Sequence, residues 1–362
     1  MMVPQTKPIV VAAGGTGGHL FVAEALAREL GSRGYRVQLI TDDRADKYAA
    51  TFPAEKIHVV TSGTVTGKGI AGKLFGVMSL AKGMLQCARL LKSINPAIVV
   101  GFGGYPTVPP LMAASVMKLP TAVHEANAVM GRANRFLAKR MKLIATGFPF
   151  KDAAFTAEQV HTGNPVRAAV LAAAALPLPE ANPLVLCVFG GSQGARIMSD
   201  VVPAAIALLP QELRLTLKIV QQARDEDQPR VTAAYAAAGV AAEISGFFSD
   251  MPARIAASHL VIARGGASTG AELAVIGRAS ILVPLPGALD QDQAANAGVL
   301  VAAHGADRVM QPDFTPQRLA AMLTEKLMHP DALREQGRNA KAIGIPDAAS
   351  RLADSVLKLA QF

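Results

Sequence analysis

The sequence contains no tryptophan, and aromatic residues make up only 5% of its 362 residues. Proteins that bind single-stranded nucleic acid stack bases on aromatic side chains, so this scarcity argues against nucleic acid as a partner. Cysteine is scarce too: Cys87 and Cys187 cannot build a disulfide framework, which favours a reducing, cytoplasmic compartment. Histidine and cysteine show no zinc-type spacing, and the first residues lack the apolar core of a signal peptide.

Long uninterrupted apolar runs are missing as well. The longest uncharged stretch, residues 97–117, is broken by three glycines and three prolines, so we expect a strand, a loop and a helix there rather than a membrane span. The net charge of +9 and the pI near 9.7 fit an anionic partner, namely a nucleotide, a phospholipid surface or nucleic acid. With 362 residues and 51% apolar content, two domains with separate cores are expected.

Two glycine-rich turns stand at corresponding places in the two halves. The first, residues 14–19, reads Gly-Gly-Thr-Gly-Gly-His and lies between an apolar run at 9–13 and a helical pattern at 22–30. The second, residues 190–195, reads Gly-Gly-Ser-Gln-Gly-Ala and follows an apolar run at 184–189. A strand, a glycine turn and a helix together present backbone N–H groups to an anion, and glycine lets a diphosphate approach closely.

Short β-type runs alternate with helical patterns in both halves. This alternation predicts an α/β fold with two doubly wound parallel sheets. The strands are expected at 9–13, 36–41, 57–60, 97–100, 121–124 and 143–145, and then at 184–189, 215–220, 241–245, 259–263 and 279–283. A turn-like segment at 161–167 joins the halves, so we place the domains at 1–163, joined by a C-terminal helix at 347–362, and at 164–346.

Basic and apolar residues are interleaved between 65 and 92, where Lys68, Lys73, Lys82 and Arg89 accompany a helical apolar pattern. A second basic cluster follows at Arg132, Arg135, Lys139, Arg140 and Lys142. An interfacial membrane contact needs this combination, because anionic lipid attracts the cations while apolar side chains insert. An ordinary amphipathic helix with a solvated basic face explains the same pattern, so both interpretations stay open.

Polar loops follow the predicted strands, at the edge where doubly wound sheets bind ligands. Glu272, one turn into a helix, could accept hydrogen bonds from a ribose diol, or it could be a solvated helix residue. Carboxylates at 225–227 and 290–292 could hold Mg²⁺, but the glycine turns and Arg264 would neutralise a diphosphate, so no metal is expected. The G-x-G-x-x-G spacing is absent and no acidic residue stands clearly at the end of the second strand, which argues against hydride transfer.

Taken in order, these loops resemble the MurG family of bacterial glycosyltransferases, which add N-acetylglucosamine (GlcNAc) to a lipid-linked muramyl-pentapeptide in peptidoglycan synthesis. The resemblance covers nearly the whole chain and rests on residues 14–19, 103–105, 124–127, 163–167, 190–195 and 264–269, with Glu272, Gln293 and Asn296. It implies the GT-B fold, in which two Rossmann-like domains face each other across a cleft. It also implies metal-independent, cofactor-free, inverting transfer by a peripheral protein at the cytoplasmic face of the bacterial inner membrane.

The resemblance also implies the site residues. The second domain would hold UDP-GlcNAc, with the uracil near Phe248, the ribose on Glu272, and the sugar on Gln293 and Asn296. The whole implied donor set is Thr16, Gly17, Gly18, Asn127, Arg167, Ser192, Phe248, Arg264, Ala267, Ser268, Thr269, Glu272, Gln293 and Asn296. The first domain would bind the acceptor diphosphate on Gly14, Gly15, Thr16, Gly17 and Gly18 and lie on anionic lipid through its basic apolar residues.

His19 is the predicted catalytic residue, because imidazole titrates near neutral pH and the first turn should face the donor. As a general base it would take the proton of the muramyl C4 hydroxyl while that oxygen attacks the anomeric carbon and UDP leaves. The sequence departs from the family at Val22, where proline is usual, at Ala126 in place of glutamine, and at 290–292. A UDP-GlcNAc 2-epimerase of the same fold and a non-catalytic nucleotide-sugar sensor remain as alternatives.

Overall fold

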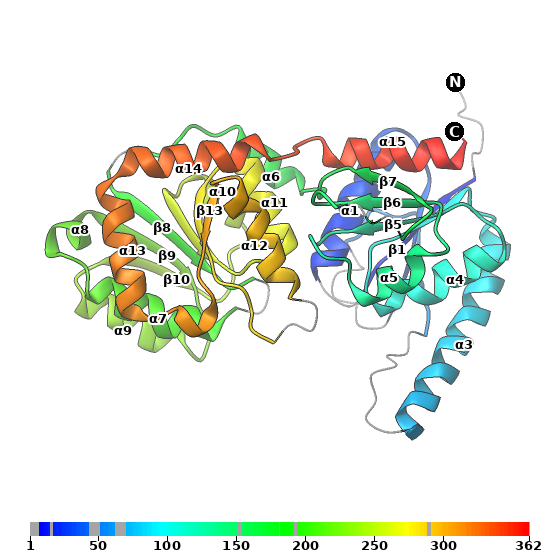
Figure 1. Cartoon of the computed structure of the whole chain (residues 1–362), viewed down its shortest axis with the longest axis horizontal. Helices are drawn as coiled ribbons and strands as arrows, with labels where there is room; N and C mark the ends of the chain where they lie inside the picture. The colour runs from blue at the N-terminus through cyan, green and yellow to red at the C-terminus, as the bar shows by residue number, and fades with distance from the viewer. Residues whose placement is uncertain are drawn as a thin grey trace. The chain divides into compact units, whose positions relative to one another are not determined.

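The computed structural model describes residues 7–14, 17–42, 51–61, 70–150, 152, 154–180, 182–191, 194–287 and 291–361, without the side chains at 70–75 and 77. The chain forms two compact units, residues 1–167 with 346–362 and residues 168–345 (Figure 1). The predicted domain bounds, 1–163 with 347–362 and 164–346, lie within a few residues of this division.

The first unit is built on a seven-stranded sheet with the order β3-β2-β1-β4-β5-β6-β7, in which all neighbours are parallel. Its strands are β1 (Ile9–Ala12), β2 (Val37–Thr41), β3 (Lys56–Val59), β4 (Ile98–Gly101), β5 (Thr121–Glu125), β6 (Leu143–Thr146) and β7 (Glu158–His161). The six predicted strands are present. The seventh, β7, escaped prediction because an edge strand with the sequence Glu-Gln-Val-His carries no apolar run.

Helices cover both faces of this sheet. Alternate residues of β1 point to opposite faces, so each face of the sheet contributes to its own core. Ile9 and Val11 belong to a core shared with α1 (Gly17–Ser32) and α15 (Ala348–Ala360), and Val10 belongs to a second core. The second core is covered by α3 (Ile70–Ile94), α4 (Val108–Val116) and α5 (Arg132–Ala138). The parallel, doubly wound arrangement predicted from the sequence is therefore confirmed for this unit.

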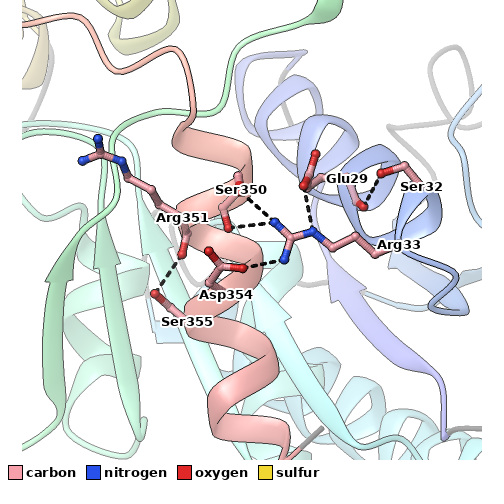
Figure 2. A network of polar contacts seen from close by, with 7 residues as sticks. All are labelled: Glu29, Ser32, Arg33, Ser350, Arg351, Asp354 and Ser355. Carbon is pink, nitrogen blue, oxygen red and sulfur yellow. Dashed lines mark hydrogen bonds and ion pairs between the residues drawn. The ribbon is translucent and has the colours of Figure 1, made fainter.

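The C-terminal helix α15 packs on the first unit beside α1. Leu352 and Val356 are fully buried in the core that contains α1, so one face of this amphipathic helix is apolar. On the polar side, Arg33 lies just after α1 and donates to Ser350 Oγ at 2.7 Å and to Glu29 Oε1 at 2.8 Å, and it also pairs with Asp354 (Figure 2). The apolar face of α15 is thus part of the first unit's core.

The second unit is built on a six-stranded parallel sheet with the order β10-β9-β8-β11-β12-β13. Its strands are β8 (Leu184–Phe189), β9 (Leu217–Gln222), β10 (Ala241–Ser245), β11 (Leu260–Ala263), β12 (Ala279–Leu282) and β13 (Ala306–Arg308). Its helices are α6 (Ala168–Ala174), α7 (Arg196–Ala207), α8 (Gln211–Thr216), α9 (Gln228–Ala237), α10 (Met251–Ala256), α11 (Ala267–Ile276), α12 (Asp292–Ala302), α13 (Pro316–Met328) and α14 (Pro330–Ala342). The five predicted strands are present, and the short β13 was not predicted.

The strand order places both glycine turns at equivalent points. β1 lies between β2 and β4, and β8 lies between β9 and β11, so the direction of winding reverses beside each of these strands. Each glycine turn directly follows its strand. Open α/β sheets bind ligands at the carboxyl ends of the strands at such reversal points. The fold therefore offers one candidate binding edge in each unit.

Candidate functional site

The first glycine turn places His19 against a second pair of glycines. His19 lies in the first turn of α1 and is half-buried. A Cβ on Gly103 would lie 3.4 Å from His19 Nε2, and a Cβ on Gly104 would lie 3.6 Å from His19 Nδ1. Gly103 and Gly104 have φ of +87° and +76°, which side chains rarely adopt. The imidazole ring thus lies beside the backbone of two glycines at the carboxyl edge of the sheet. Gly15 and Thr16 lie outside the described residues.

An acidic residue does stand at the end of the second strand, and the sequence-based statement that none is clearly placed there was wrong. Asp42 directly follows β2 and is fully buried, and its Oδ1 lies 3.1 Å from the position of a Cβ on Gly14. In the sequence, Asp42, Asp43 and Arg44 follow one another, so the last residue of the strand cannot be identified from the sequence alone. Residues 43–50 lie outside the described part. Of the two sequence features, only the absent G-x-G-x-x-G spacing therefore speaks against hydride transfer.

A buried carboxylate organises the loop that carries Asn127. Glu125 is 3% exposed at the end of β5, and its two oxygens accept hydrogen bonds from the backbone and the side chain of Asn127, from Gly131 N and from Asn134 Nδ2, at 2.9 to 3.1 Å. These donors fix the loop 126–131 at the carboxyl edge of the first sheet. Ala126 is 8% exposed, so the departure from the family's glutamine falls on a position whose side chain is covered.

The joining segment 163–167 folds back onto the first unit. Asn164 Nδ2 donates to the carbonyl of Ala126 at 2.8 Å, and a Cβ on Gly147 would overlap the Asn164 side chain. Arg167 lies with its guanidinium 5.0 Å from the centre of the Phe21 ring on α1. Arg167 thus lies against the start of α1, the helix that also carries His19.

In the second unit, the loop after β11 packs tightly on the start of α12. A Cβ on Gly265 would lie 2.4 Å from the backbone oxygen of Gln293, so only glycine fits. Asn296 is 1% exposed and donates to the Gly265 carbonyl at 3.2 Å, while Gln293 Oε1 accepts from the N–H of Leu285 at 3.0 Å. The structure brings the predicted sugar-contact residues together, and both amides also hold the surrounding loops.

Arg264 is tied to the loop that follows β12. Its Nη1 donates to the carbonyls of Val283 and Pro284 at 3.1 and 3.2 Å, and its Nη2 donates to Gln311 Oε1 at 2.7 Å. Burial lowers the pKa of this guanidinium. These hydrogen bonds hold the proline-rich loop in place. Neutralisation of a diphosphate by the Arg264 side chain stays a prediction.

Helix α11 presents an N-terminus that no side chain caps. Gly266 occupies the N-cap, and Ala267, Ser268 and Thr269 form the half-buried first turn. The first N–H groups of a helix have no partner within the helix and, with the helix dipole, favour an anion. Glu272 is half-buried in the second turn of the same helix. Ser192, another member of the implied donor set, lies outside the described residues.

The two phenylalanines after β10 differ sharply in exposure. Phe248 is 7% exposed and lies under the guanidinium of Arg254, 4.1 Å from its ring centre. Arg254 is fixed by Glu243 and Asp250 at 2.8 and 2.7 Å. Phe248 therefore offers a base its backbone rather than its ring. Phe247 is 71% exposed, and sequence reasoning gave it no role although it stands at the same strand end.

A cavity of about 680 Å³ opens beside the second glycine turn, at the ends of β9 and β10. It is lined by Gly194, Arg224, Asp225, Glu226, Gln228, Ser245, Gly246 and Phe247. Gln222 links its two sides, because it accepts from Gly190 N at 3.4 Å and donates to the Gly246 carbonyl at 3.1 Å. The size suits a ligand of nucleotide dimensions, and the exposed Phe247 ring could cover one face of a base.

The acidic run 225–227 has a structural explanation. Asp227 is buried at the N-cap of α9 and pairs with Arg230, and Asp225 accepts from Gln228 Nε2 at 2.8 Å. Among the residues that the structure describes, no group of three or more histidine, cysteine, aspartate or glutamate side chains is placed to hold a metal ion. Asp290, in the other acidic run, lies outside the described part.

Comparison with known proteins places both units in one family. Residues 9–146 match the glycosyltransferase family 28 N-terminal domain, and residues 185–352 match the glycosyltransferase family 28 C-terminal domain. The chain is 55% identical over 360 residues to the UDP-N-acetylglucosamine–N-acetylmuramyl-(pentapeptide) pyrophosphoryl-undecaprenol N-acetylglucosamine transferase of Methylobacterium nodulans, covering 97% of this chain and 96% of that protein. It is 53% identical over 350 residues to the protein of the same name from Brucella abortus, covering 96% and 92%.

Solved structures give the same picture at the level of the fold. The crystal structure of Acinetobacter baumannii MurG matches with a TM-score of 0.81 and 28% identity over 97% of this chain and 99% of that one. A UDP-GlcNAc 2-epimerase from Neisseria meningitidis, bound to UDP-GlcNAc, matches with a TM-score of 0.67 but only 13% identity over 97% of this chain and 100% of that one. Because the sequence identity to the epimerase is only 13%, that similarity concerns the fold alone.

Proposed function

The chain belongs to the family of UDP-N-acetylglucosamine–N-acetylmuramyl-(pentapeptide) pyrophosphoryl-undecaprenol N-acetylglucosamine transferases, and from this premise we propose that it transfers GlcNAc from UDP-GlcNAc to the lipid-linked muramyl-pentapeptide. It is a glycosyltransferase of the GT-B fold that acts in peptidoglycan synthesis. The observation that carries this function is identity of 53 to 55% over nearly the full length of the named relatives.

We assign the donor to the second unit. The free N-terminus of α11 would hold the diphosphate at Ala267, Ser268 and Thr269, with Ser192 from the neighbouring glycine turn. Glu272, one turn further along, would accept the two ribose hydroxyls, and the uracil would meet the backbone at Phe248. Gln293 and Asn296 would contact the sugar. The support is that the described residues of this set follow the carboxyl ends of β10, β11 and β12, which lie at one edge of the second sheet.

We assign the acceptor diphosphate to the first glycine turn, Gly14–Gly18, and proton removal to His19. The C4 hydroxyl oxygen of the muramyl sugar forms the new bond to the anomeric carbon as the bond to the UDP oxygen breaks. The hydroxyl proton passes to the imidazole and the electron pair leaves with UDP, so the anomeric centre inverts once. Asn127 and Arg167 would contribute to donor contacts. No cofactor enters this scheme, and backbone donors at the helix N-terminus stabilise the leaving charge.

The decisive experiment measures UDP release from UDP-GlcNAc with and without the lipid-linked acceptor, in the presence of EDTA. We expect acceptor-dependent release that EDTA does not abolish. Formation of UDP-ManNAc from the donor alone would instead identify a 2-epimerase. Binding of UDP-GlcNAc without UDP release in the presence of the acceptor would identify a sensor.

The Glu272 assignment predicts a specific loss of affinity in Glu272→Gln. A carboxylate that accepts hydroxyl hydrogen bonds contributes roughly 1.5 to 3 kcal/mol, so UDP should bind roughly 10- to 100-fold more weakly. Calorimetric titration with UDP measures this change, and Glu325→Gln, at an exposed position on α13, is the matched control. The variant should discriminate little between UDP and 2′-deoxy-UDP, whereas the wild type should prefer UDP. Unchanged UDP affinity in Glu272→Gln would refute the ribose contact.

We further propose that the first unit lies on anionic lipid, at the cytoplasmic face of the inner membrane. The exposed side of the α3–α5 layer carries apolar residues, with Met78 61%, Leu85 63% and Phe136 49% exposed, and it also carries the exposed cations Lys82, Arg89 and Arg140. Cys87 and Leu91 on the opposite side of α3 are fully buried, so the amphipathic helix has both a core face and an outer face. None of the helices in the described part of the chain is long and apolar enough to cross a membrane.

Charge reversal on α3 tests this membrane contact. Each cation near an anionic surface contributes roughly 1 kcal/mol, so Lys82→Glu with Arg89→Glu should lower partition onto phosphatidylglycerol vesicles by at least about 30-fold at low salt. Arg196→Glu with Lys218→Glu, at exposed positions on α7 and β9, changes the total charge by the same amount and is the matched control. Vesicle sedimentation gives the partition coefficient, and equal loss in both proteins would argue against a specific surface. Lys68 and the Lys73 side chain, also predicted to contribute, lie outside the described residues.

A further inference from the structure

A second cavity, of about 200 Å³, lies in the second unit on the side opposite the candidate donor site. Its walls include residues 258–259, directly before β11, and residues 276–279, at the entry to β12, whereas the donor residues follow the carboxyl ends of those strands. Helix α14 and the loop after α6 complete the cavity. It is therefore separate from the site already described.

Among the residues that the structure describes, the lining combines an apolar wall with cations and contains no acidic residue. The apolar wall is formed by Leu176, Leu178, Pro179, Ile276, Ala279, Pro330 and Leu333. The charged lining is formed by Arg278, Arg334, Arg338 and Lys341. One of these cations, Arg334, pairs with Asp331 on α14 at 3.0 Å. Arg338 and Lys341 have no ion pair among the described residues, so two cations of the lining stand without a counter-charge.

Arg278 adds a buried positive charge to this cavity, because no carboxylate among the described residues pairs with its guanidinium. Its side chain is 5% exposed, and its nitrogens donate to the carbonyls of Ala256, Ile276 and Gly277. These carbonyls end α10 and α11, so the guanidinium is held rigidly by two helix C-termini. Burial lowers its pKa, and no ion pair within the described residues balances the charge. An anion in the cavity would supply the missing counter-charge at short range.

His259 closes one side without adding a charge. Its Nδ1 accepts from Val185 N at 3.0 Å, so the proton lies on Nε2, which donates to the carbonyl of Glu180 at 2.8 Å. Burial and the neighbouring Arg334 and Arg278 lower its pKa. His259 thus links the loop that forms the apolar wall, through the Glu180 carbonyl, to Val185 of β8.

We propose that this cavity binds an amphiphilic phosphate, with the phosphate on Arg338 and Lys341 and a short apolar chain against Leu178, Ile276 and Leu333. A volume of about 200 Å³ corresponds to roughly seven water-sized groups, which suits a phosphate with a few carbons and is too small for a nucleotide sugar. Phosphate fits better than a carboxylate because its extra charge and oxygen atoms suit two cations that lack an ion-pair partner among the described residues, and the apolar wall adds affinity only for a ligand with a hydrocarbon part.

The test compares hexyl phosphate, inorganic phosphate and hexanol by calorimetric titration of the full-length protein. We expect hexyl phosphate to bind at least tenfold more tightly than either of the other two. The double variant Arg338→Ala with Lys341→Ala should lose at least tenfold in affinity for hexyl phosphate. The control pair Arg196→Ala with Lys218→Ala removes the same charges from exposed positions outside the cavity and should bind as the wild type does.

Equal affinity for inorganic phosphate and hexyl phosphate, or equal loss in the two double variants, would overturn the proposal. If the Arg338 and Lys341 variant proved unfolded by circular dichroism, Leu178→Glu, at a position 59% exposed, would test the apolar wall without disturbing the core and should abolish the preference for hexyl phosphate. Competition by hexyl methyl phosphate, a diester like the phosphate of a phospholipid, would assign the natural source to lipid. Its failure to compete would assign the source to a soluble phosphate ester, and both outcomes keep the binding site. UDP binding, measured in parallel, reports separately on the donor site.

Discussion

His19→Ala should lower kcat for transfer to the lipid-linked acceptor by about 10²- to 10⁴-fold, the range that removal of a positioned general base produces. The ring lies within 3.4 to 3.6 Å of the places where Gly103 and Gly104 would carry a Cβ, so glycine backbone leaves the imidazole room beside it. Its position in the first turn of α1 holds it at the carboxyl edge of the first sheet. Steady-state kinetics with saturating donor and acceptor measure the effect.

The control for this prediction separates chemistry from structure. His58→Ala removes a half-buried histidine of the same unit, whose Nε2 contacts Gln38 Oε1 at 2.9 Å on an edge strand, and it should keep near wild-type turnover. In His19→Ala the affinity for UDP, which we assign to the second unit, should stay within about twofold of wild type. A folded His19→Ala protein with turnover close to wild type would remove His19 from the role of general base.

The fold was predictable because its strongest signals are local. β1 and β8 are continuous apolar runs that end in glycine, and the repetition of this unit half a chain apart indicates two Rossmann-like units. The edge strand β7 and the three-residue β13 escaped because strands exposed on one side, or very short, leave little periodicity to detect. The helix pair α13 and α14 was likewise not singled out, although both helices are amphipathic.

The candidate site was predictable where a residue type and a strand end coincide, as for His19 and Glu272. It was not predictable where tertiary contacts decide what a side chain does. Arg264 has the sequence context of a phosphate ligand, yet its hydrogen bonds go to the carbonyls of Val283 and Pro284. Phe247 and Phe248 are neighbours in sequence, and only the structure shows that Arg254 covers one and leaves the other exposed.

Acidification should destabilise the first unit through His124, which is fully buried beside the candidate acceptor edge. Burial lowers its pKa to about 4, and the nearby His19 acts in the same direction. Its Nε2 donates to the Gly163 carbonyl at 3.2 Å, whereas Nδ1 is buried with no hydrogen-bond partner, so a proton added there would meet no acceptor. Unfolded histidine has a pKa near 6.5, so the unfolded state binds the extra proton first.

The sign and size of the effect follow from this difference. Stability rises with pH wherever the unfolded state binds more protons, so it should fall as the pH drops through the window from about 6.5 to about 4. Between pH 7 and 5 this one group should cost about 2 kcal/mol. Urea unfolding followed by circular dichroism measures the loss, and His124→Gln, whose amide can still donate to Gly163, should lose about 2 kcal/mol less over the same interval. An equal loss in both proteins would assign the acid sensitivity to other groups, because only His124 distinguishes them.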